Sequence, residues 1–305
     1  MAQPTLQVAQ LTETRTRKGS VSDSLWAVAA RRVRRDRLSM VALTVLLIMT
    51  ALSVGAPLIA GVMHIDPETV TDQTFLPPGT AGHLLGTDDL GRDHFIRLLY
   101  AGQVSLGIAF FAGTLSIFVG ITIGVAAGYF GGLLDDLVLW FITTIDSIPF
   151  LYLLLLITSI FRPSPPVLVL ILGLFGWTTT MRLVRGETLS LREREFIVAA
   201  KAIGATSNRV MFVHIVPNVI SIIIVTIALN LGGLILLESA LSFLGFGVQP
   251  PATSWGFMLS DAQELFTKGP HLVWGPGLLI VITVLCLFVL GDGLRDAFDP
   301  QLVEK

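Results

Sequence analysis

Six long runs of apolar residues, separated by more polar segments of varied length, dominate the pattern of this 305-residue chain. Most of the runs approach or exceed the roughly 20 residues that a helix needs to cross the hydrocarbon core of a bilayer. The runs cover residues 39–62, 104–127, 137–160, 167–181, 219–241 and 273–290. The fourth is the shortest, and its start depends on how the prolines of segment 162–166 are read. The pattern predicts an all-α integral membrane protein with six transmembrane helices.

Composition and the distribution of basic residues support this topology. The chain is 53% hydrophobic and only 14% charged, which is more apolar surface than a soluble core of this length can bury. Sixteen of the 20 Lys and Arg residues lie before the first run, between the fourth and fifth runs, or after the sixth. Because basic segments stay in the cytoplasm, both termini are expected to be cytoplasmic. The single cysteine, Cys286, excludes an intrachain disulfide.

The segment before the first run combines arginines with apolar residues. Polar residues at 22–24 offer an N-cap for an amphipathic helix, expected at 22–38, that carries five arginines. We expect this helix to lie in the headgroup layer, with its arginines reaching membrane lipid phosphates. The arginines also fit a topology signal without a fixed helix. Residues 1–21 are expected to form a disordered cytoplasmic tail, and residues 293–305 a second cytoplasmic tail.

Segment 63–100, between the first and second runs, is acidic and rich in turn residues, and we expect it to be an extracytoplasmic loop. A threonine and two aspartates at 87–89 can cap a short helix that approaches the membrane surface. His83, His94 and the aspartates are also potential metal ligands. Their spacing matches no dedicated ligand set, so capping and an Asp–Arg pair are favoured and no metal site is predicted.

Three glycines in the second run form a stripe of small residues. Gly120, Gly124 and Gly128 recur every four residues and therefore share one face of a helix. Such a stripe allows another helix to approach closely. The partner helix is expected either in this chain or in another subunit.

Two carboxylates lie inside apolar runs, where an unpaired charge is costly. Asp146 lies in the cytoplasmic third of the third run, close to Pro149. We expect Arg182 or Arg185 to neutralise it, and favour this pairing over contact with a transported substrate. Glu238 lies near the outer end of the fifth run and is expected either to line a water-filled vestibule or to reach the interface. Both carboxylates are candidates for a translocation path.

The polar segment 186–217, between the fourth and fifth runs, has the pattern of a structured insert. Ser190 and Glu193 match a capping box, so a helix is expected to begin close to residue 191. Its apolar face is expected to hold Phe196, Ala200 and Ile203.

Gly204 is expected to end this helix, because glycine readily adopts the left-handed conformation of a C-terminal turn. Thr206 or Ser207 can cap a second short helix that runs through His214. Pro217 is expected to mark its end and the entry to the fifth span. Helix, glycine turn, helix and proline together predict a rigid elbow on the cytoplasmic face.

At these residues the chain resembles the permease subunits of binding-protein-dependent ABC importers, in the dipeptide, oligopeptide and nickel branch. The loop of that family carries Glu-Ala-Ala, three further residues, Gly and a later Pro. The matching residues here are Ala199, Ala200, Gly204 and Pro217. The acidic position is Val198 in this chain, which leaves open whether Glu195, one turn earlier, takes over a polar contact to the ATPase.

The resemblance covers about residues 31–300. It includes Leu-Gly-Thr-Asp-Asp-Leu-Gly-Arg-Asp at 85–93 and Gly-Asp-Gly-Leu-Arg-Asp at 291–296, which are similar to the C-type permease of this branch. Segments 241–251 and 254–256 carry further similarity. Together these signatures are more specific than the loop pattern alone.

The resemblance implies a six-span subunit of a prokaryotic plasma membrane, with a coupling-helix elbow between spans four and five. Its implied partners are a second, different permease, two cytoplasmic ATP-binding subunits and an extracytoplasmic solute-binding protein; nucleic acid is not among them. The chain has no Gly-x-x-x-x-Gly-Lys-Ser/Thr phosphate loop, so ATP and Mg²⁺ are expected on the ATPase subunits and no catalytic activity is expected here. Dipeptides or oligopeptides are the expected cargo, with nickel or another small solute as the alternative.

Other classes of membrane protein fit the sequence less well. A secondary transporter normally shows repeated halves with discontinuous helices and has no use for a docking elbow. An intramembrane aspartyl protease would need facing aspartates, and Asp146 with Asp292 lacks the expected surrounding motif. All five histidines fall in the predicted loops between the spans, which argues against a Ser/His protease.

Overall fold

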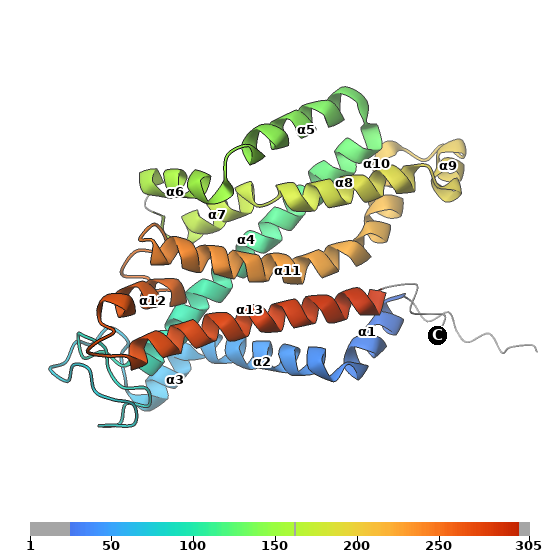
Figure 1. The fold of residues 1–305 in the computed structure, drawn as a ribbon. Coiled ribbons are helices and arrows are strands. Elements are labelled where there is room, and N and C mark those ends of the chain that lie inside the picture. Colours follow the sequence, from blue (N-terminus) through green and yellow to red (C-terminus); the bar gives the residue numbers. More distant parts are fainter. Residues whose placement is uncertain (1–24, 162, 299–305) are drawn as a thin grey trace, which may run out of the picture.

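A computed structural model describes residues 25–161 and 163–298 of the chain. Within these ranges every regular element is a helix, and the long helices lie side by side in a bundle (Figure 1). Five helical segments are long and apolar enough to cross a membrane, and one bent pair raises the number to as many as six. The predicted all-α membrane fold is therefore confirmed. The expected tail at 1–21, the N-cap at 22–24 and residues 299–305 lie outside the described residues.

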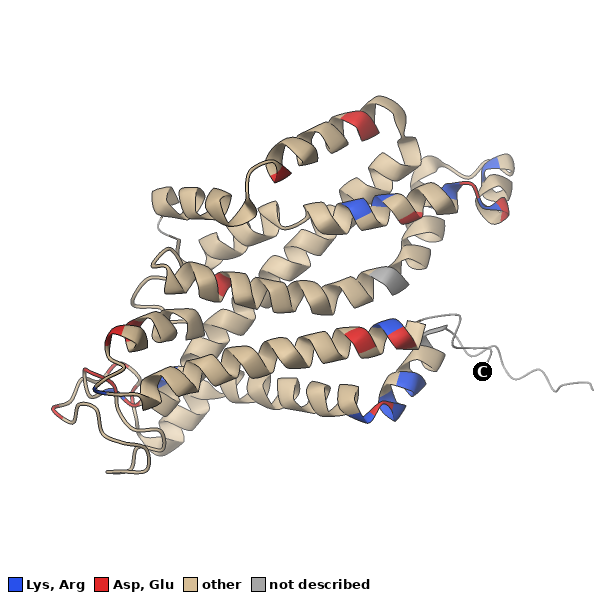
Figure 2. Ribbon diagram, in the orientation of Figure 1, with Lys and Arg blue, Asp and Glu red and all other residues tan. Residues whose placement is uncertain are grey.

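The two ends of the bundle differ in structure and charge. One end, here called the loop end, holds the irregular segment 64–93 and α12 (Trp255–Glu264). The opposite end, the elbow end, holds α1 (Leu25–Arg35), α9 (Glu195–Ala202) and the end of α13 (His271–Phe298) (Figure 1). Lysines and arginines gather mainly at the elbow end (Figure 2). The asymmetry found in the sequence is thus also an asymmetry in space.

The amphipathic helix expected before the first span is present as α1. Asp36 separates it from α2 (Arg37–Val54) and caps α2, accepting hydrogen bonds from the backbone N–H of Leu38 at 3.2 Å and of Ser39 at 3.1 Å. Hydrogen bonding from Ser39, first from its side chain and then from its backbone, holds the pKa of Asp36 below its usual range. Gly293 of α13 packs against this cap, where any Cβ would collide with the Ser39 hydroxyl.

The first span is shorter than the apolar run 39–62. α2 ends at Val54, and Gly55 leads into a separate helix, α3 (Ala56–Met63). Pro57 explains the break, because it lacks an N–H donor and its ring crowds the carbonyl four residues earlier.

The second span is longer than the run 104–127 and forms one 37-residue helix, α4 (His94–Phe130). The separate short helix that the sequence predicts is the first part of α4. Its N-cap is Asp93, whose carboxylate accepts from the N–H of Ile96 at 2.7 Å, and not one of the residues at 87–89. The irregular loop therefore ends at residue 93 and not at residue 100.

The third run, 137–160, does not form one straight helix. α5 (Gly132–Asp146) and α6 (Phe150–Phe161) are bent by 80° relative to each other. Pro149 stands directly before α6, where its missing N–H and its ring prevent the backbone of α5 from continuing. Asp146 consequently lies at a hinge.

The fourth span extends well beyond residue 181. α7 (Pro165–Phe175) and α8 (Thr178–Arg192) together make a 28-residue span, so the elbow leaves the bundle later than residue 186. The capping-box prediction is wrong, because Ser190 lies inside α8 and Glu193 follows its last residue. Arg194 occupies the N-cap position of α9 instead.

The fifth and sixth spans also exceed their apolar runs. α10 (Ser207–Arg209) continues through a π-helical turn, Val210–Ile215, directly into α11 (Val216–Phe243). The prediction that Pro217 ends a separate short helix is therefore wrong. Pro217 is the second residue of α11 and follows the π-helical turn, a local irregularity of the kind that accommodates a proline in a continuing helix. α13 continues to Phe298, so the start of the expected tail at 293 is helical.

The glycine stripe of α4 packs against α8 of the same chain, which answers the question left open by the sequence. A Cβ placed on Gly124 would lie 2.8 Å from the backbone oxygen of Met181. Gly120 and Gly128 have equally close neighbours in α8. The stripe therefore serves the internal packing of this chain.

We predict opposite effects for two Gly→Ala substitutions in α4. Gly124→Ala places a methyl group against Met181 and is expected to destabilise the protein by about 1–3 kcal/mol through overpacking. Gly107→Ala is the control, because a Cβ there has no neighbour within 4 Å and alanine favours helix by about 1 kcal/mol. Thermal unfolding of the purified protein in detergent measures both, and equal stability of the two variants would contradict the packing role.

Candidate functional site

The elbow is a short protruding helix anchored by one buried face. Ile197 and Ala200 of α9 are buried, and Ile197 belongs to an apolar cluster with Val210 and Ile215. The face predicted from the sequence is thus only partly correct: Ala200 is inside, whereas Phe196 and Ile203 are exposed. The signal that identifies the true face is the i, i+3 spacing of Ile197 and Ala200.

The exposed side of the elbow is unusually apolar. Val198 is 55% exposed and Ile203 is 88% exposed, with Phe196 nearby in α9. Clustered apolar side chains that remain exposed on a structured protrusion are typical of a protein interaction site. Two further residues that the sequence analysis proposed lie on α9. Glu195 is its first residue, and Ala199 is exposed next to the buried Ala200.

Gly204 turns the chain after α9, as the sequence predicts. Its φ is +88°, which lies in the left-handed region that glycine adopts without strain. The N–H of Ala205 donates to the carbonyl of Ala200, and the N–H of Gly204 donates to that of Lys201, both at 3.0 Å, which is a Schellman motif. Thr206 then caps α10, accepting from the N–H of Arg209 at 3.4 Å. These bonds give the elbow a defined shape.

The elbow is also tied to the end of α4. Arg192 donates from Nη1 to the carbonyl oxygen of Gly128 at 3.1 Å. The Lys201 ammonium lies 4.9 Å from the ring centroid of Tyr129, a cation–π distance. Neither contact is evident from sequence, because both join residues more than 60 positions apart.

Two of the three acidic residues of α5, one near each end of the helix, pair with arginines of α8. Asp146 forms the predicted ion pair with Arg182. The other candidate, Arg185, pairs instead with Asp135, donating from Nη2 at 2.6 Å and also from Nε. The Asp135 side chain is 12% exposed and that of Asp146 is 35% exposed, so the pair at the hinge is the more accessible. Sequence reasoning missed Asp135, although it stands before an apolar run.

Glu238 occupies a different environment from either of the two expected ones. It is fully buried, so it neither lines an open vestibule nor reaches the interface. Its carboxylate accepts from the hydroxyl of Ser242 at 2.7 Å and from that of Ser105 at 3.2 Å. The Ser105 hydroxyl in turn accepts from the backbone N–H of Trp255 at 3.1 Å. This network joins α4, α11 and α12 and is structural in character.

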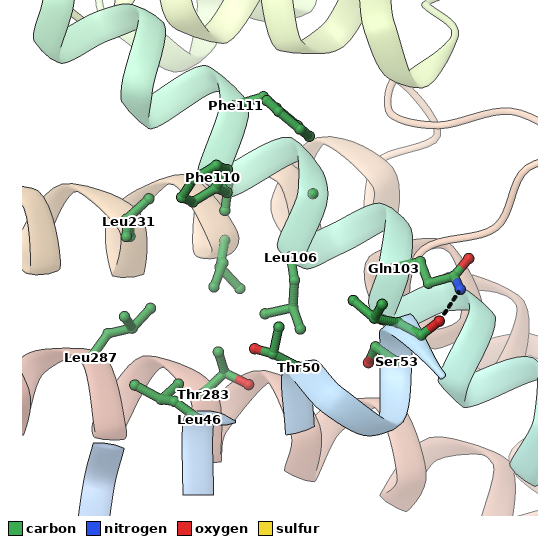
Figure 3. A pocket seen from close by; sticks show the side chains of 15 residues that line it. Leu46, Thr50, Ser53, Gln103, Leu106, Phe110, Phe111, Leu231, Thr283 and Leu287 are labelled. Carbon is green, nitrogen blue, oxygen red and sulfur yellow. Dashed lines mark hydrogen bonds between the residues drawn. The ribbon is translucent and has the colours of Figure 1, made fainter. Parts of the chain in front are cut away.

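Two cavities of similar volume lie among the membrane helices, and their linings differ. The first, here called the apolar cavity, has about 500 Å³ and lies between α2, α4, α11 and α13. Leu46, Leu106, Leu231 and Leu287 point into it, with Phe110 and Phe111 nearby (Figure 3). The side-chain amide of Gln103 at one end donates to the Val54 carbonyl at 3.4 Å. Thr50, Ser53 and Thr283 add hydroxyl groups to this lining, but none of the described residues that form it is charged.

The second cavity, here called the Asp146 cavity, has about 510 Å³ and lies beside the hinge between α5 and α6. Its polar lining comes from Asp146, Thr178, Thr179, Thr226 and Asn230. Asn230 also donates to the hydroxyl of Thr180 at 3.3 Å. A cavity that combines membrane depth with a charge and several hydroxyl and amide groups suits a polar solute.

Comparisons with known proteins agree with these features. Residues 120–304 match the family model "Binding-protein-dependent transport system inner membrane component", and residues 24–78 match "N-terminal TM domain of oligopeptide transport permease C". A dipeptide transport system permease protein of Alkalihalophilus pseudofirmus is 37% identical over 92% of this chain and 91% of its own length. The oligopeptide transport system permease protein of Mycobacterium tuberculosis is 38% identical over 90% and 94%. That of Escherichia coli K12 is 35% identical over 91% and 92%.

The serine network predicts unequal effects for two serine substitutions in α4. Ser105→Ala removes one of the two serine partners of Glu238 and the acceptor of the Trp255 N–H, and is expected to destabilise the protein by about 1–3 kcal/mol. Ser116→Ala is the control, because Ser116 is equally buried on the same helix but its hydroxyl has no hydrogen-bond partner among the described residues. Denaturation of the purified protein should show a change close to zero for Ser116→Ala, and equal losses would contradict the network.

Proposed function

Because this chain belongs to the family of binding-protein-dependent transport system inner membrane components, we propose that it is a permease subunit of an ATP-driven importer of short peptides. It is a multi-pass protein of the prokaryotic plasma membrane. The names of the relatives support dipeptides or oligopeptides as cargo. Nickel or another small solute remains the alternative, because in such systems a separate binding protein selects the cargo.

The observation that carries the coupling role is the elbow. An anchored helix with exposed Val198 and Ile203 offers a surface for a cytoplasmic ATP-binding subunit. Glu195 opens the same helix and is the candidate for a polar contact where the family has its acidic residue. Two such subunits would bind ATP and Mg²⁺. The concentration of basic residues at the elbow end supports a cytoplasmic location for that end and for both termini.

The remaining partners are a second permease and an extracytoplasmic solute-binding protein. The Asp146 cavity is the proposed contribution of this chain to the translocation path, shared with the second permease. Its position beside α8 supports a mechanism in which closure of the ATPases moves the elbow and α8 together. In this mechanism the Asp146–Arg182 pair lies where the path changes shape, whereas the buried Glu238 stabilises the packing of the surrounding helices.

The proposed transport function makes two predictions, and the first of them concerns the elbow turn. Gly204→Val forces a β-branched residue into the left-handed region, at a strain of about 1–3 kcal/mol, and is expected to lower peptide uptake and peptide-stimulated ATPase activity. Gly204→Asn is the control, because asparagine tolerates this conformation. Proteoliposomes that contain the whole complex and its binding protein provide both measurements.

Full activity of Gly204→Val would contradict the elbow role. Loss of activity in both variants would instead indicate that the surface at this position, and not its backbone conformation, contacts the ATPase.

The second prediction of the transport function tests whether the Asp146 cavity or the apolar cavity belongs to the translocation path. Gly233 lines the Asp146 cavity and Gly107 lines the apolar cavity, and a Cβ at either has no neighbour within 4 Å. Gly233→Trp is expected to lower peptide uptake about tenfold, equivalent to about 1.4 kcal/mol of added barrier, because the indole obstructs the path. Gly107→Trp is expected to retain uptake.

Both complexes must purify intact for the comparison. Normal uptake by Gly233→Trp together with loss in Gly107→Trp would reverse the assignment of the cavities.

A further inference from the structure

A third cavity, here called the outer cavity, lies at the loop end, outside the apolar spans. It has about 300 Å³ and is enclosed by the irregular segment 64–93, the start of α4, the turn at 250–253 and α12. Four carboxylates line it, those of Glu68, Asp89, Asp261 and Glu264. No activity described so far uses this cavity.

Arg97 and Thr253 also line this cavity, and each has one buried polar atom without a hydrogen-bond partner in the described part of the chain. Arg97 is only 6% exposed, and although its Nη1 pairs with Asp88, its Nε has no hydrogen-bond partner. Thr253 is 8% exposed, and its hydroxyl also has no partner. A buried donor without an acceptor costs about 1–3 kcal/mol, so both groups favour a ligand or water with an acceptor atom.

The carboxylates impose the opposite requirement. Both arginines of the lining already pair with Asp88. The Asp88 carboxylate accepts one hydrogen bond from Arg92 Nε at 2.8 Å and another from Arg97. In the part of the chain that the structure describes, no ion pair involves Glu68, Asp261 or Glu264. Partial burial raises the pKa of Asp261, although Arg97 opposes that change. A cation placed in the cavity would therefore relieve an unfavourable concentration of negative charge.

A zwitterionic ligand satisfies both requirements in a single molecule. A bare cation would leave the donors of Arg97 and Thr253 without an acceptor, and an anion would be repelled by the carboxylates. A zwitterion presents an acceptor and a cation a few bonds apart. The volume of about 300 Å³ is at the small end of the range for ligand pockets, which suits a molecule of dipeptide size.

We propose that the outer cavity binds a small α-amino zwitterion such as a dipeptide, with its ammonium group on Asp261 and Glu264 and its carboxylate or carbonyl on Arg97 and Thr253. This inference rests on the proposed function, since it names the place where a released peptide first contacts the permease. The elements that line the cavity lie at the end opposite the elbow (Figure 1), which is the external end in the proposed topology.

The test is equilibrium binding of dialanine to the complete complex in lipid nanodiscs without the binding protein, measured by calorimetry. Asp261→Asn and Thr253→Val are nearly isosteric and are each expected to weaken binding about tenfold, the effect of one lost charge-assisted or buried hydrogen bond. N-acetyl-dialanine, which lacks the ammonium group, is expected to bind more weakly to the unmodified complex. Asp72→Asn is the matched control, because Asp72 is exposed on the same loop and does not line the cavity.

The outcomes separate this inference from the proposed function. Binding that weakens in both cavity variants and not in Asp72→Asn supports the inference. Absence of dialanine binding, or equal binding by all variants, overturns it, while peptide-stimulated ATPase activity in the presence of the binding protein would leave the transport function intact. If the two cavity variants reduce affinity for the binding protein and leave dialanine binding unchanged, the cavity is a protein contact and the inference is wrong.

Discussion

The close contact between α4 and α8 is the constraint on which the rest of the structure depends. Lipid is as apolar as leucine, so helices in a membrane associate mainly through packing and polar contacts, and small residues determine how near two backbones come. Gly120, Gly124 and Gly128 leave room for the backbone and short side chains of α8. Once α8 is packed there, two of its three arginines, Arg182 and Arg185, pair with α5, and its end leads into the elbow. Larger side chains at these three glycine positions would displace α8, and with it the arginines and the elbow.

The two ion pairs between α5 and α8 have different physical settings. The Asp135–Arg185 pair is the more buried and has two hydrogen bonds, so it fixes one end of α5. The Asp146–Arg182 pair is more exposed and lies at the hinge before α6. Exposed pairs contribute little to stability because water competes for both partners. The hinge end of α5 is therefore held less firmly than the other end, which suits its position beside the proposed translocation path.

Apolar runs predicted the helical class and the approximate position of every span, because hydropathy reports the hydrocarbon layer directly. The ends of the helices were harder to predict, because a helix continues as long as its backbone hydrogen bonds are satisfied. For example, α4 begins at His94, ahead of the expected run. The left-handed turn at Gly204 followed from local chemistry, and the sequence limited the expected partner of Asp146 to Arg182 or Arg185. The Glu238 network and the outer cavity could not be predicted, because each joins residues far apart in sequence and requires the packed structure.

The stem of the elbow and one wall of the Asp146 cavity are the same helix, α8. Thr178 and Thr179 at its start line the cavity, and Arg192 at its end is bonded to α4 just before the chain turns into α9. These residues are separated by about 20 Å of uninterrupted helix, since each residue adds about 1.5 Å. A helix of that length transmits displacement without absorbing it, provided that no break intervenes. A force on α9 that shifts α8 along α4 must therefore alter the cavity, and the less firmly held Asp146 hinge is where the surrounding wall can yield.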